Sequence, residues 1–137
     1  MKREDVREKT MQLVYQMDMT GDFEVADLSI VDENVKAAGK KQAAETLAAV
    51  QDHHEEIDRL ISDNLDNWTL ERIAKTDLAI LRTAVAEMLY VESIPVRVSI
   101  NEAVDLAKKY GDERSYAFIN SVLGKISHIL NDGANEK

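Results

Sequence analysis

The segment NWTLERIAKTDLAILRTAVAEMLYVESIP (residues 67–95) can be interpreted as one long helix or as two shorter ones. A single helix over residues 69–92 would place Asp77 in the middle of the apolar face. Burying an unpaired carboxylate there would cost several kcal/mol. A break near Thr76 removes the conflict, because Thr76 becomes the N-cap and Asp77 lies in the first turn, where free amides favour an acid. We therefore predict two helices, over residues 69–75 and 77–92.

The next segment, VSINEAVDLAKKYGD (residues 98–112), carries both start and stop signals for a helix. Ser99 and Glu102 have the spacing of a capping box. Gly111 is expected to end the helix in the left-handed conformation. The apolar positions predict a buried face, made of Ala103, Leu106, Ala107 and Tyr110. The opposite face consists of Asn101, Asp105 and Lys108. We predict a helix over residues 99–110.

The rest of the chain adds four further helical segments. Apolar periodicity predicts helices over residues 4–19, 42–65 and 115–130, and a weaker pattern predicts one short helix with loops over residues 22–39. With only one Pro and five Gly in 137 residues, the composition favours helices throughout. A chain of this length can bury one sizeable core. The expected fold class is a single all-α domain.

The predicted helix over residues 4–19 is apolar on two sides. Its main inner face consists of Val6, Thr10, Leu13, Val14 and Met17. A second strip, made of Met11, Tyr15 and Met19, lies on the opposite side. A helix of this kind needs two packing partners. Either the helix is sandwiched in the core, or the Tyr15 strip is offered to another chain.

The net charge of −9 argues at first against a nucleic-acid partner, but its distribution is uneven. Residues 21–95 contain 7 basic and 16 acidic side chains, whereas residues 1–20 and 96–131 are nearly balanced. The two ends can therefore form a locally basic surface if the fold brings them together. Phe118 is expected at the edge of its helix, with basic residues near it in the sequence, namely Lys108, Arg114 and Lys125. An aromatic ring among cations is a platform for RNA bases, although a lone boundary aromatic can also be the edge of a core.

Several kinds of site are not indicated by the sequence. The chain has no cysteine, no Gly-rich phosphate loop, no G-x-S-x-G motif and no H-E-x-x-H motif. His53 and His54 point about 100° apart on a helix, without a third ligand at a useful spacing, and are interpreted as core or boundary residues. We expect no metal, no cofactor and no enzymatic activity. Without a long apolar run or a secretory signal, the sequence favours a cytoplasmic protein.

Four segments together resemble the NusB family of transcription antitermination factors. They are the basic start MKR, REKTMQLVYQMD (7–18), NWTLERIAKTDLAILRTAVAEMLY (67–90) and IPVRVSINEAVDLAKKYGDERSYAFINSVLGKI (94–126). The resemblance implies an all-α fold of about seven helices in two small packed bundles. We expect one RNA-binding domain over residues 1–131, with sub-bundles at about 1–65 and 69–131, and a frayed tail at 132–137.

The resemblance also implies binding partners. Family members bind the boxA sequence of nascent RNA, above all in ribosomal RNA operons, as a heterodimer with NusE, a small-subunit ribosomal protein. The complex then joins other Nus factors and RNA polymerase. This is binding and scaffolding work without covalent chemistry.

Residue by residue, the resemblance assigns Lys2, Arg3, Arg7 and Phe118 to RNA and two side chains to the partner, whereas Lys108 and Arg114 are added to the RNA face on charge grounds. The predicted RNA-binding residues are Lys2, Arg3, Arg7, Lys108, Arg114 and Phe118. The residues predicted to face NusE are Tyr15 and Asp77. Glu4 and Asp5 interrupt the basic motif at the amino terminus, so we expect tight boxA binding to require NusE. The alternative is a homo-oligomer that buries the Tyr15 strip and masks the basic surface.

Overall fold

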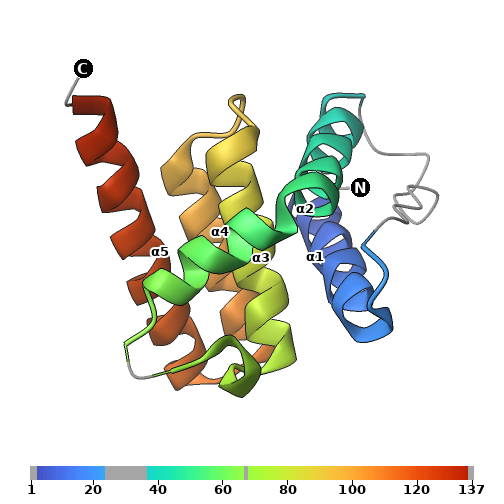
Figure 1. Ribbon diagram of the computed structural model, residues 1–137. Helices are drawn as coiled ribbons and strands as arrows, with labels where there is room; N and C mark the ends of the chain where they lie inside the picture. Colours follow the sequence, from blue (N-terminus) through green and yellow to red (C-terminus); the bar gives the residue numbers. More distant parts are fainter. Residues whose placement is uncertain (1–2, 24–36, 67, 136–137) are drawn as a thin grey trace.

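Within the residues that it describes, the computed structural model contains five α-helices and one short 3-10 turn, arranged as in Figure 1. It describes the backbone of residues 3–23, 37–66 and 68–135, and the side chains of residues 5–23, 39–66 and 68–131. The elements are α1 (Arg3–Thr20), α2 (Ala37–Asp63), η2 (Leu70–Arg72), α3 (Lys75–Tyr90), α4 (Val96–Tyr110) and α5 (Glu113–Asn135). The all-α prediction is confirmed. The count of seven helices is wrong for the described residues, and the short helix expected within 22–39 lies largely outside them.

Helix α3 is the centre of the fold, because it packs against each of the other four α-helices. Every residue from Leu78 to Glu87 is buried. A helix that is buried on all sides must be covered by other elements on all sides. Figure 1 shows the result: α1 and the first part of α2 lie on one side of α3, and α5 lies on the other.

One continuous hydrophobic core joins all five α-helices. Its most deeply buried members include Val14, Leu47, Ile61, Leu81, Ile119 and Leu123. The side chains of α3 belong to this core together with those of α1 and α2 on one side and those of α4 and α5 on the other. The chain therefore packs around a shared central helix.

Helix α2 bends at His53, whose backbone (φ −129°, ψ 20°) is not helical. Beyond the bend, the second part of α2 crosses the front of the molecule in Figure 1. The His53 ring stacks on Tyr90 at 4.3 Å and the His54 ring stacks on Phe23 at 4.4 Å, measured between ring centroids. Both histidines are half-buried, which confirms their interpretation as boundary residues.

The break predicted before α3 is present, but its details differ. The expected helix over residues 69–75 is only the 3-10 turn η2. Helix α3 begins at Lys75 with Ala74 as its N-cap and without a side-chain cap, so the prediction of Thr76 as N-cap is wrong. Asp77 lies in the first turn of α3, as predicted.

The predicted capping box at Ser99 and Glu102 is also wrong. Helix α4 begins three residues earlier, at Val96, with Pro95 as its N-cap. Ser99 is buried inside the helix, and its hydroxyl donates a hydrogen bond to Glu87 Oε1 at 2.8 Å. A buried carboxylate on α3 has taken the place of the helix amides as the partner of this hydroxyl.

The C-terminal end of α4 differs from the prediction as well. Gly111 is extended (φ −124°, ψ −154°), so it does not end the helix in the left-handed conformation. That conformation occurs at Gly21 (φ 73°), after α1. Tyr110 was predicted to be buried and is 41% exposed. Helix α5 continues to Asn135, beyond the predicted end of the folded chain at residue 131.

Candidate nucleic-acid interface

An open groove lies where the start of α3 meets the first turns of α5, at the bottom of the view in Figure 1. Its volume is about 370 Å³. Its lining consists of Trp68, Arg72, Ile73, Ala74, Asp77, Arg114, Ser115 and Phe118. Three residues that the sequence assigned to RNA or to the partner, namely Asp77, Arg114 and Phe118, therefore meet in one place.

Two aromatic rings form walls of the groove. Trp68 is 55% exposed, although it is the largest side chain in the chain. Phe118 is half-buried and packs against the core, which confirms its predicted boundary position. Trp68 has no role among the residues predicted from the sequence. A single Trp in the polar stretch DNWT between two helices was the signal that could have identified it.

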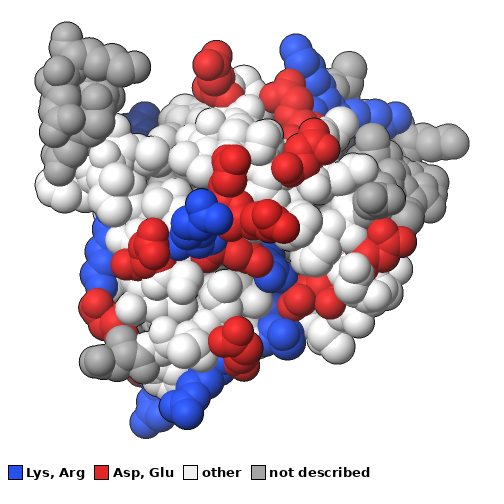
Figure 2. Space-filling model, viewed as in Figure 1, with Lys and Arg blue, Asp and Glu red and all other residues white. Residues whose placement is uncertain are grey.

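Two arginines, Arg72 and Arg114, contribute positive charge to the groove. Both are exposed. Among the side chains that the structure describes, neither has a carboxylate oxygen within 4 Å. In the view of Figure 2, basic side chains lie along the lower edge of the molecule, below a central area where both signs are mixed.

Asp112 sets the position of Arg114 by capping α5. Its Oδ1 accepts hydrogen bonds from the backbone amides of Arg114 (2.9 Å) and Ser115 (3.0 Å). The helix was predicted to begin at Ser115, and this cap extends it by two residues to Glu113. Arg114 is thus held on the first turn of a rigid helix.

Asp77 connects α3 to α5 at the edge of the groove. Its Oδ2 accepts a hydrogen bond from Ser115 Oγ at 3.3 Å. Burial raises the pKa of Asp77, the Ser115 hydrogen bond opposes this change, and the nearby charge of Asp112 adds to it. The carboxylate therefore lies between two helix starts as a partly desolvated acceptor.

Gly111 allows α4 to turn closely into α5. A Cβ atom at this position would lie 2.4 Å from Ser115 Oγ and 2.5 Å from Ser115 Cβ. The glycine is required by this close approach, since its φ is accessible to any residue. Nearby on α4, Lys108 places its Nζ 5.2 Å from the centre of the Tyr116 ring.

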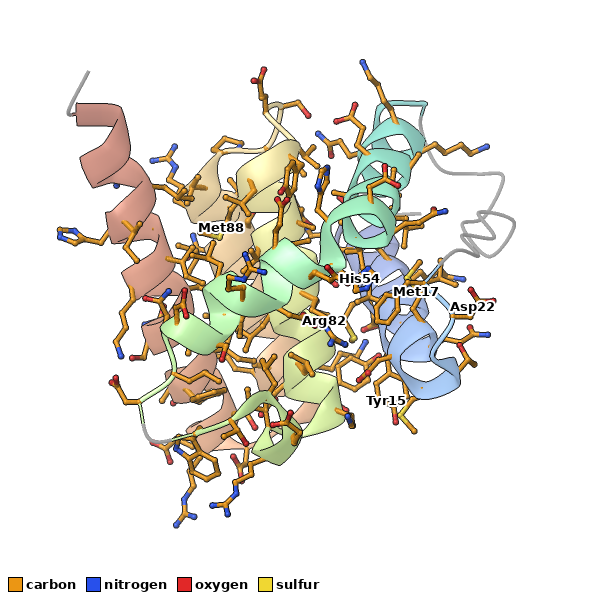
Figure 3. All side chains as sticks on the ribbon, in the orientation of Figure 1. Tyr15, Met17, Asp22, His54, Arg82 and Met88 are labelled. Atoms are coloured by element: carbon orange, nitrogen blue, oxygen red, sulfur yellow. The ribbon has the colours of Figure 1, made fainter. Side chains whose placement is uncertain are left out.

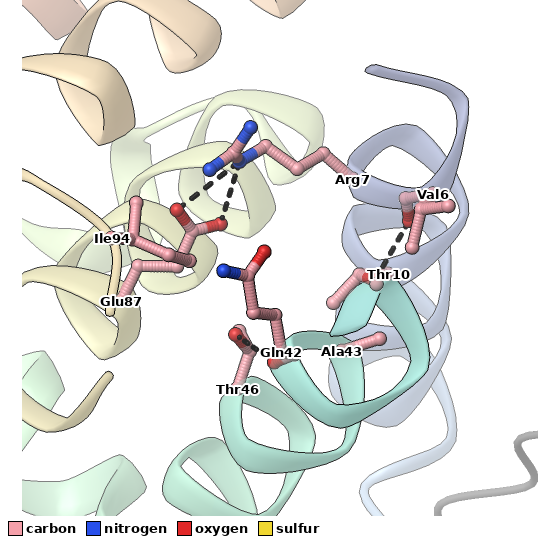
Figure 4. Close-up of a pocket in the computed structure, with 9 residues that line it drawn as sticks. Val6, Arg7, Thr10, Gln42, Ala43, Thr46, Glu87 and Ile94 are labelled. Carbon is pink, nitrogen blue, oxygen red and sulfur yellow. Dashed lines mark hydrogen bonds and ion pairs between the residues drawn. The ribbon is translucent and has the colours of Figure 1, made fainter. Parts of the chain in front are cut away.

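Arg7, which was predicted to bind RNA, is not part of the groove lining and is buried. The side chain is 7% exposed, and its Nε lies 3.2 Å from both carboxylate oxygens of Glu87. Figure 4 shows the side chain reaching from α1 to α3. Its Nη1 lies 3.7 Å from Glu102. With Ser99, these residues form a buried network that joins α1, α3 and α4.

Burial raises the pKa of Glu87, while the positive charge of Arg7 and the hydrogen bonds from Ser99 and Arg7 oppose the change. Such a network fixes the relative positions of α1, α3 and α4, because each buried charge needs its partner. No local sequence pattern indicates this network, since Arg7 and Glu87 are 80 residues apart.

The remaining predicted residues lie near the amino terminus and on α1. Lys2 is outside the described residues, and of Arg3 only the backbone is described, as the first residue of α1. Along the second strip of α1, Met11 is 2% exposed, Tyr15 is half-buried and Met19 is 57% exposed. Tyr15 lies at the lower part of α1 in Figure 3.

The end of α1 is held close to the start of α3. Lys75 and Asp18 form an ion pair at 3.7 Å, and Arg82 lies 3.4 Å from Asp18 and 2.7 Å from Asp58. Figure 3 shows Arg82 on the side of α3 that faces α1 and α2. The Tyr15 strip and the groove therefore belong to neighbouring parts of the surface.

Within residues 3–23, 37–66 and 68–135, no cluster of metal-binding side chains is found. In the same residues, no helix combines the length and apolar character needed to cross a bilayer.

Comparison with known proteins decides the family. The model of the NusB family matches residues 4–128. The chain belongs to the NusB family. It is 47% identical to the transcription antitermination protein NusB of Bacillus mycoides (strain KBAB4) over 133 residues, which span 95% of this chain and 100% of that relative.

Solved NusB structures have the same fold. T. maritima NusB superposes with a TM-score of 0.81 at 32% identity, over 93% of this chain and 92% of that one. The antitermination factors NusB and NusE have been solved in complex with dsRNA. The similar chain in that complex superposes with a TM-score of 0.75 at 28% identity, over 90% of this chain and 94% of that one. NusB proteins are non-enzymatic transcription antitermination factors, and the chain is one of them.

Proposed function

We propose that the chain binds boxA RNA of nascent ribosomal RNA transcripts as a heterodimer with NusE. The complex then joins other Nus factors and RNA polymerase to suppress termination. The observation that carries the proposal is the groove in which Arg114, Phe118 and Asp77 meet. The similar structure of NusB with NusE and dsRNA supports it.

We assign Arg114 and Phe118, which line the groove, to RNA, together with Lys108, which lies outside the groove lining against the Tyr116 ring. An aromatic ring near cations suits a single strand, because bases stack on the ring while phosphates pair with the cations. We assign Tyr15 and Asp77 to NusE. Since the end of α1 lies beside the start of α3, the RNA and protein surfaces adjoin at Asp77.

The burial of Arg7 sharpens the predicted dependence on NusE. With Arg7 in the core, the amino-terminal motif offers RNA only Lys2 and Arg3. Fewer phosphate contacts give weaker binding and a smaller dependence on salt. We expect the chain alone to bind boxA weakly and NusE to strengthen that binding.

The test is a gel-shift titration of boxA RNA and a scrambled RNA, with and without NusE, over a series of salt concentrations. The proposal predicts preferential boxA binding that NusE strengthens. Equal affinity for both RNAs would refute sequence-specific recognition. Low-nanomolar binding by the chain alone at physiological salt would refute the requirement for NusE.

Two substitutions assign the contacts. Arg114→Ala should weaken binding and lower the salt slope by about 0.7, the value expected for one phosphate contact on a single strand. Arg97→Ala, at an exposed position on α4 away from the groove, is the matched control. Phe118→Ala should weaken binding without changing the salt slope.

The second candidate function is a homo-oligomer that masks the RNA surface. The exposure of Met19, next to Tyr15 on the same strip, is the observation that favours it. Size-exclusion chromatography with light scattering, with and without NusE, separates the two candidates. A dimer that NusE neither dissociates nor binds would favour self-association and exclude the heterodimer.

A further inference from the structure

We propose that the groove is a binding site for an unpaired RNA base, which stacks on Trp68 while Arg72 and Arg114 hold the neighbouring phosphates. The proposal rests on the proposed RNA-binding function and deepens it. It adds two contact residues, Trp68 and Arg72, which neither the motifs nor the comparisons indicate.

The first argument is the exposure of Trp68. The indole is 55% exposed and lines the same groove as Phe118. A partly exposed aromatic ring on the wall of an open groove offers a flat face on which a second ring can stack. Stacking a base on such a ring is worth about 1–3 kcal/mol and is tolerant of sequence.

The second argument is the charge around this ring. Residues 21–95 contain 16 acidic side chains, yet Arg72, within that segment, pairs with no carboxylate among the described residues. Arg114 faces the same groove from α5. Two guanidinium groups beside an aromatic ring suit a single RNA strand, because the guanidinium groups can bind the phosphates while a base enters the groove and stacks on the ring.

The third argument is the direction of the two helices. Both α3 and α5 begin at the groove, so the positive ends of two long helices point towards it. Asp77, Asp112 and Glu113 lie at the same helix starts and offset part of this potential. Among the residues that line the groove itself, the two arginines outnumber the single carboxylate of Asp77.

The size and edge of the groove also fit a base. A volume of about 370 Å³ lies within the range of ligand-binding clefts. Ser115 places a hydroxyl in its lining, where the hydrogen-bonding edge of a base can meet it. An apolar side chain of a protein partner would fill the groove equally well, but it would leave both arginines without anionic partners.

Trp68 is the only tryptophan of the chain, so its fluorescence reports directly on the groove. The experiment titrates the full-length chain, at micromolar concentration and without NusE, with single-stranded boxA RNA and with the same RNA annealed to its complement. Gel shifts measure binding independently. We expect the single strand to quench Trp68 fluorescence in parallel with binding, and the duplex to quench it much less.

Substitutions test each contact in the presence of NusE. Trp68→Ala should weaken boxA binding about 5-fold or more, and Trp68→Phe should retain most of the affinity. Ile129→Ala, at a 48% exposed position further along α5, is the matched control and should not alter binding. Arg72→Ala should lower the salt slope by about 0.7, whereas Arg97→Ala should not.

The possible failures are distinguishable. If boxA binds without changing Trp68 fluorescence and Trp68→Ala binds normally, the base site is overturned while the proposed function stands. If Trp68→Ala loses NusE but keeps RNA, the groove is a protein site and the inference is also overturned. If the chain binds no boxA with or without NusE, the proposed function itself fails.

Discussion

Two arginine sites of this molecule use the same side chain for opposite purposes. Arg7 is 7% exposed and lies against Glu87 and Glu102, whereas Arg72 and Arg114 are exposed beside aromatic rings. A buried guanidinium must be paired, because an uncompensated charge in the core is very costly. An exposed guanidinium without a carboxylate partner remains available to a ligand. Position in the fold, and not residue type, separates an arginine paired in the core from one that a ligand can reach.

The largest expected effect comes from breaking the buried network. Glu87→Ala leaves Arg7 without its partner in the core and removes the acceptor of Ser99, so it should lower the free energy of unfolding by about 3–5 kcal/mol. Urea unfolding followed by circular dichroism measures the change. The double variant Arg7→Met with Glu87→Leu should recover most of the loss, because apolar side chains of similar volume can replace a buried ion pair.

The double variant also tests the distinction between the buried Arg7 and the exposed arginines of the groove. If Arg7 is only structural, the folded double variant should bind boxA with NusE as tightly as the parent chain does. A folded double variant with weakened RNA binding would show that Arg7 contacts RNA and would contradict the distinction between the two sites.

A smaller effect is expected where α4 turns into α5. Gly111→Ala places a methyl group against Ser115 and should cost about 1–3 kcal/mol, because the first turn of α5 must shift. Gly124→Ala, within α5, is the control. Its Cβ would meet no atom within 4 Å, so it should stabilise the protein by about 0.5–1 kcal/mol. Equal effects at both glycines in urea unfolding would show that the close approach at Gly111 is unimportant.

The smallest expected effect is the pH dependence that Asp77 contributes. Its pKa is raised in the folded protein, so the folded state holds the proton more tightly than the unfolded state. The resulting stability is fully present below the ordinary value of 3.8 and is lost as the pH rises through the raised pKa. Compared with Asp77→Asn, the parent chain should lose stability over this range, by less than about 1 kcal/mol because the group is only half-buried.

Urea unfolding of both proteins between pH 3.5 and about pH 7 measures this difference. Asp105→Asn, at an exposed position on α4, controls for the loss of one negative charge. A gain in the stability of the parent chain relative to Asp77→Asn as the pH rises would contradict the raised pKa.

Local sequence patterns predicted which segments are helical better than they predicted the residues at which each helix begins and ends. The break before α3 followed from the single carboxylate of Asp77, and the buried face of α5 followed from its apolar spacing. The start of α4 was predicted wrongly, because the S-x-x-E pattern at Ser99 is identical whether its partners are helix amides or distant residues. Only the packing of α4 against α3 and α1 shows that Ser99 and Glu102 bind Glu87 and Arg7.

The candidate site likewise contains residues that the sequence identifies and residues that only the structure brings to the site. Phe118 and Arg114 could be identified from the sequence, because an aromatic residue among cations is a local pattern and the family resemblance places it. The sequence marks Trp68 only as a single tryptophan in a polar stretch and does not distinguish Arg72, since both lie more than 40 residues before Arg114 and meet it only when η2 folds against α5.

The sequence by itself therefore determined the helical class, the family and the break that positions α3, because these depend on spacing and composition along the chain. The tertiary structure decided which charges are buried and which remain free. Burial depends on contacts between residues that are distant in sequence, and for Arg7 that contact with Glu87 spans 80 positions.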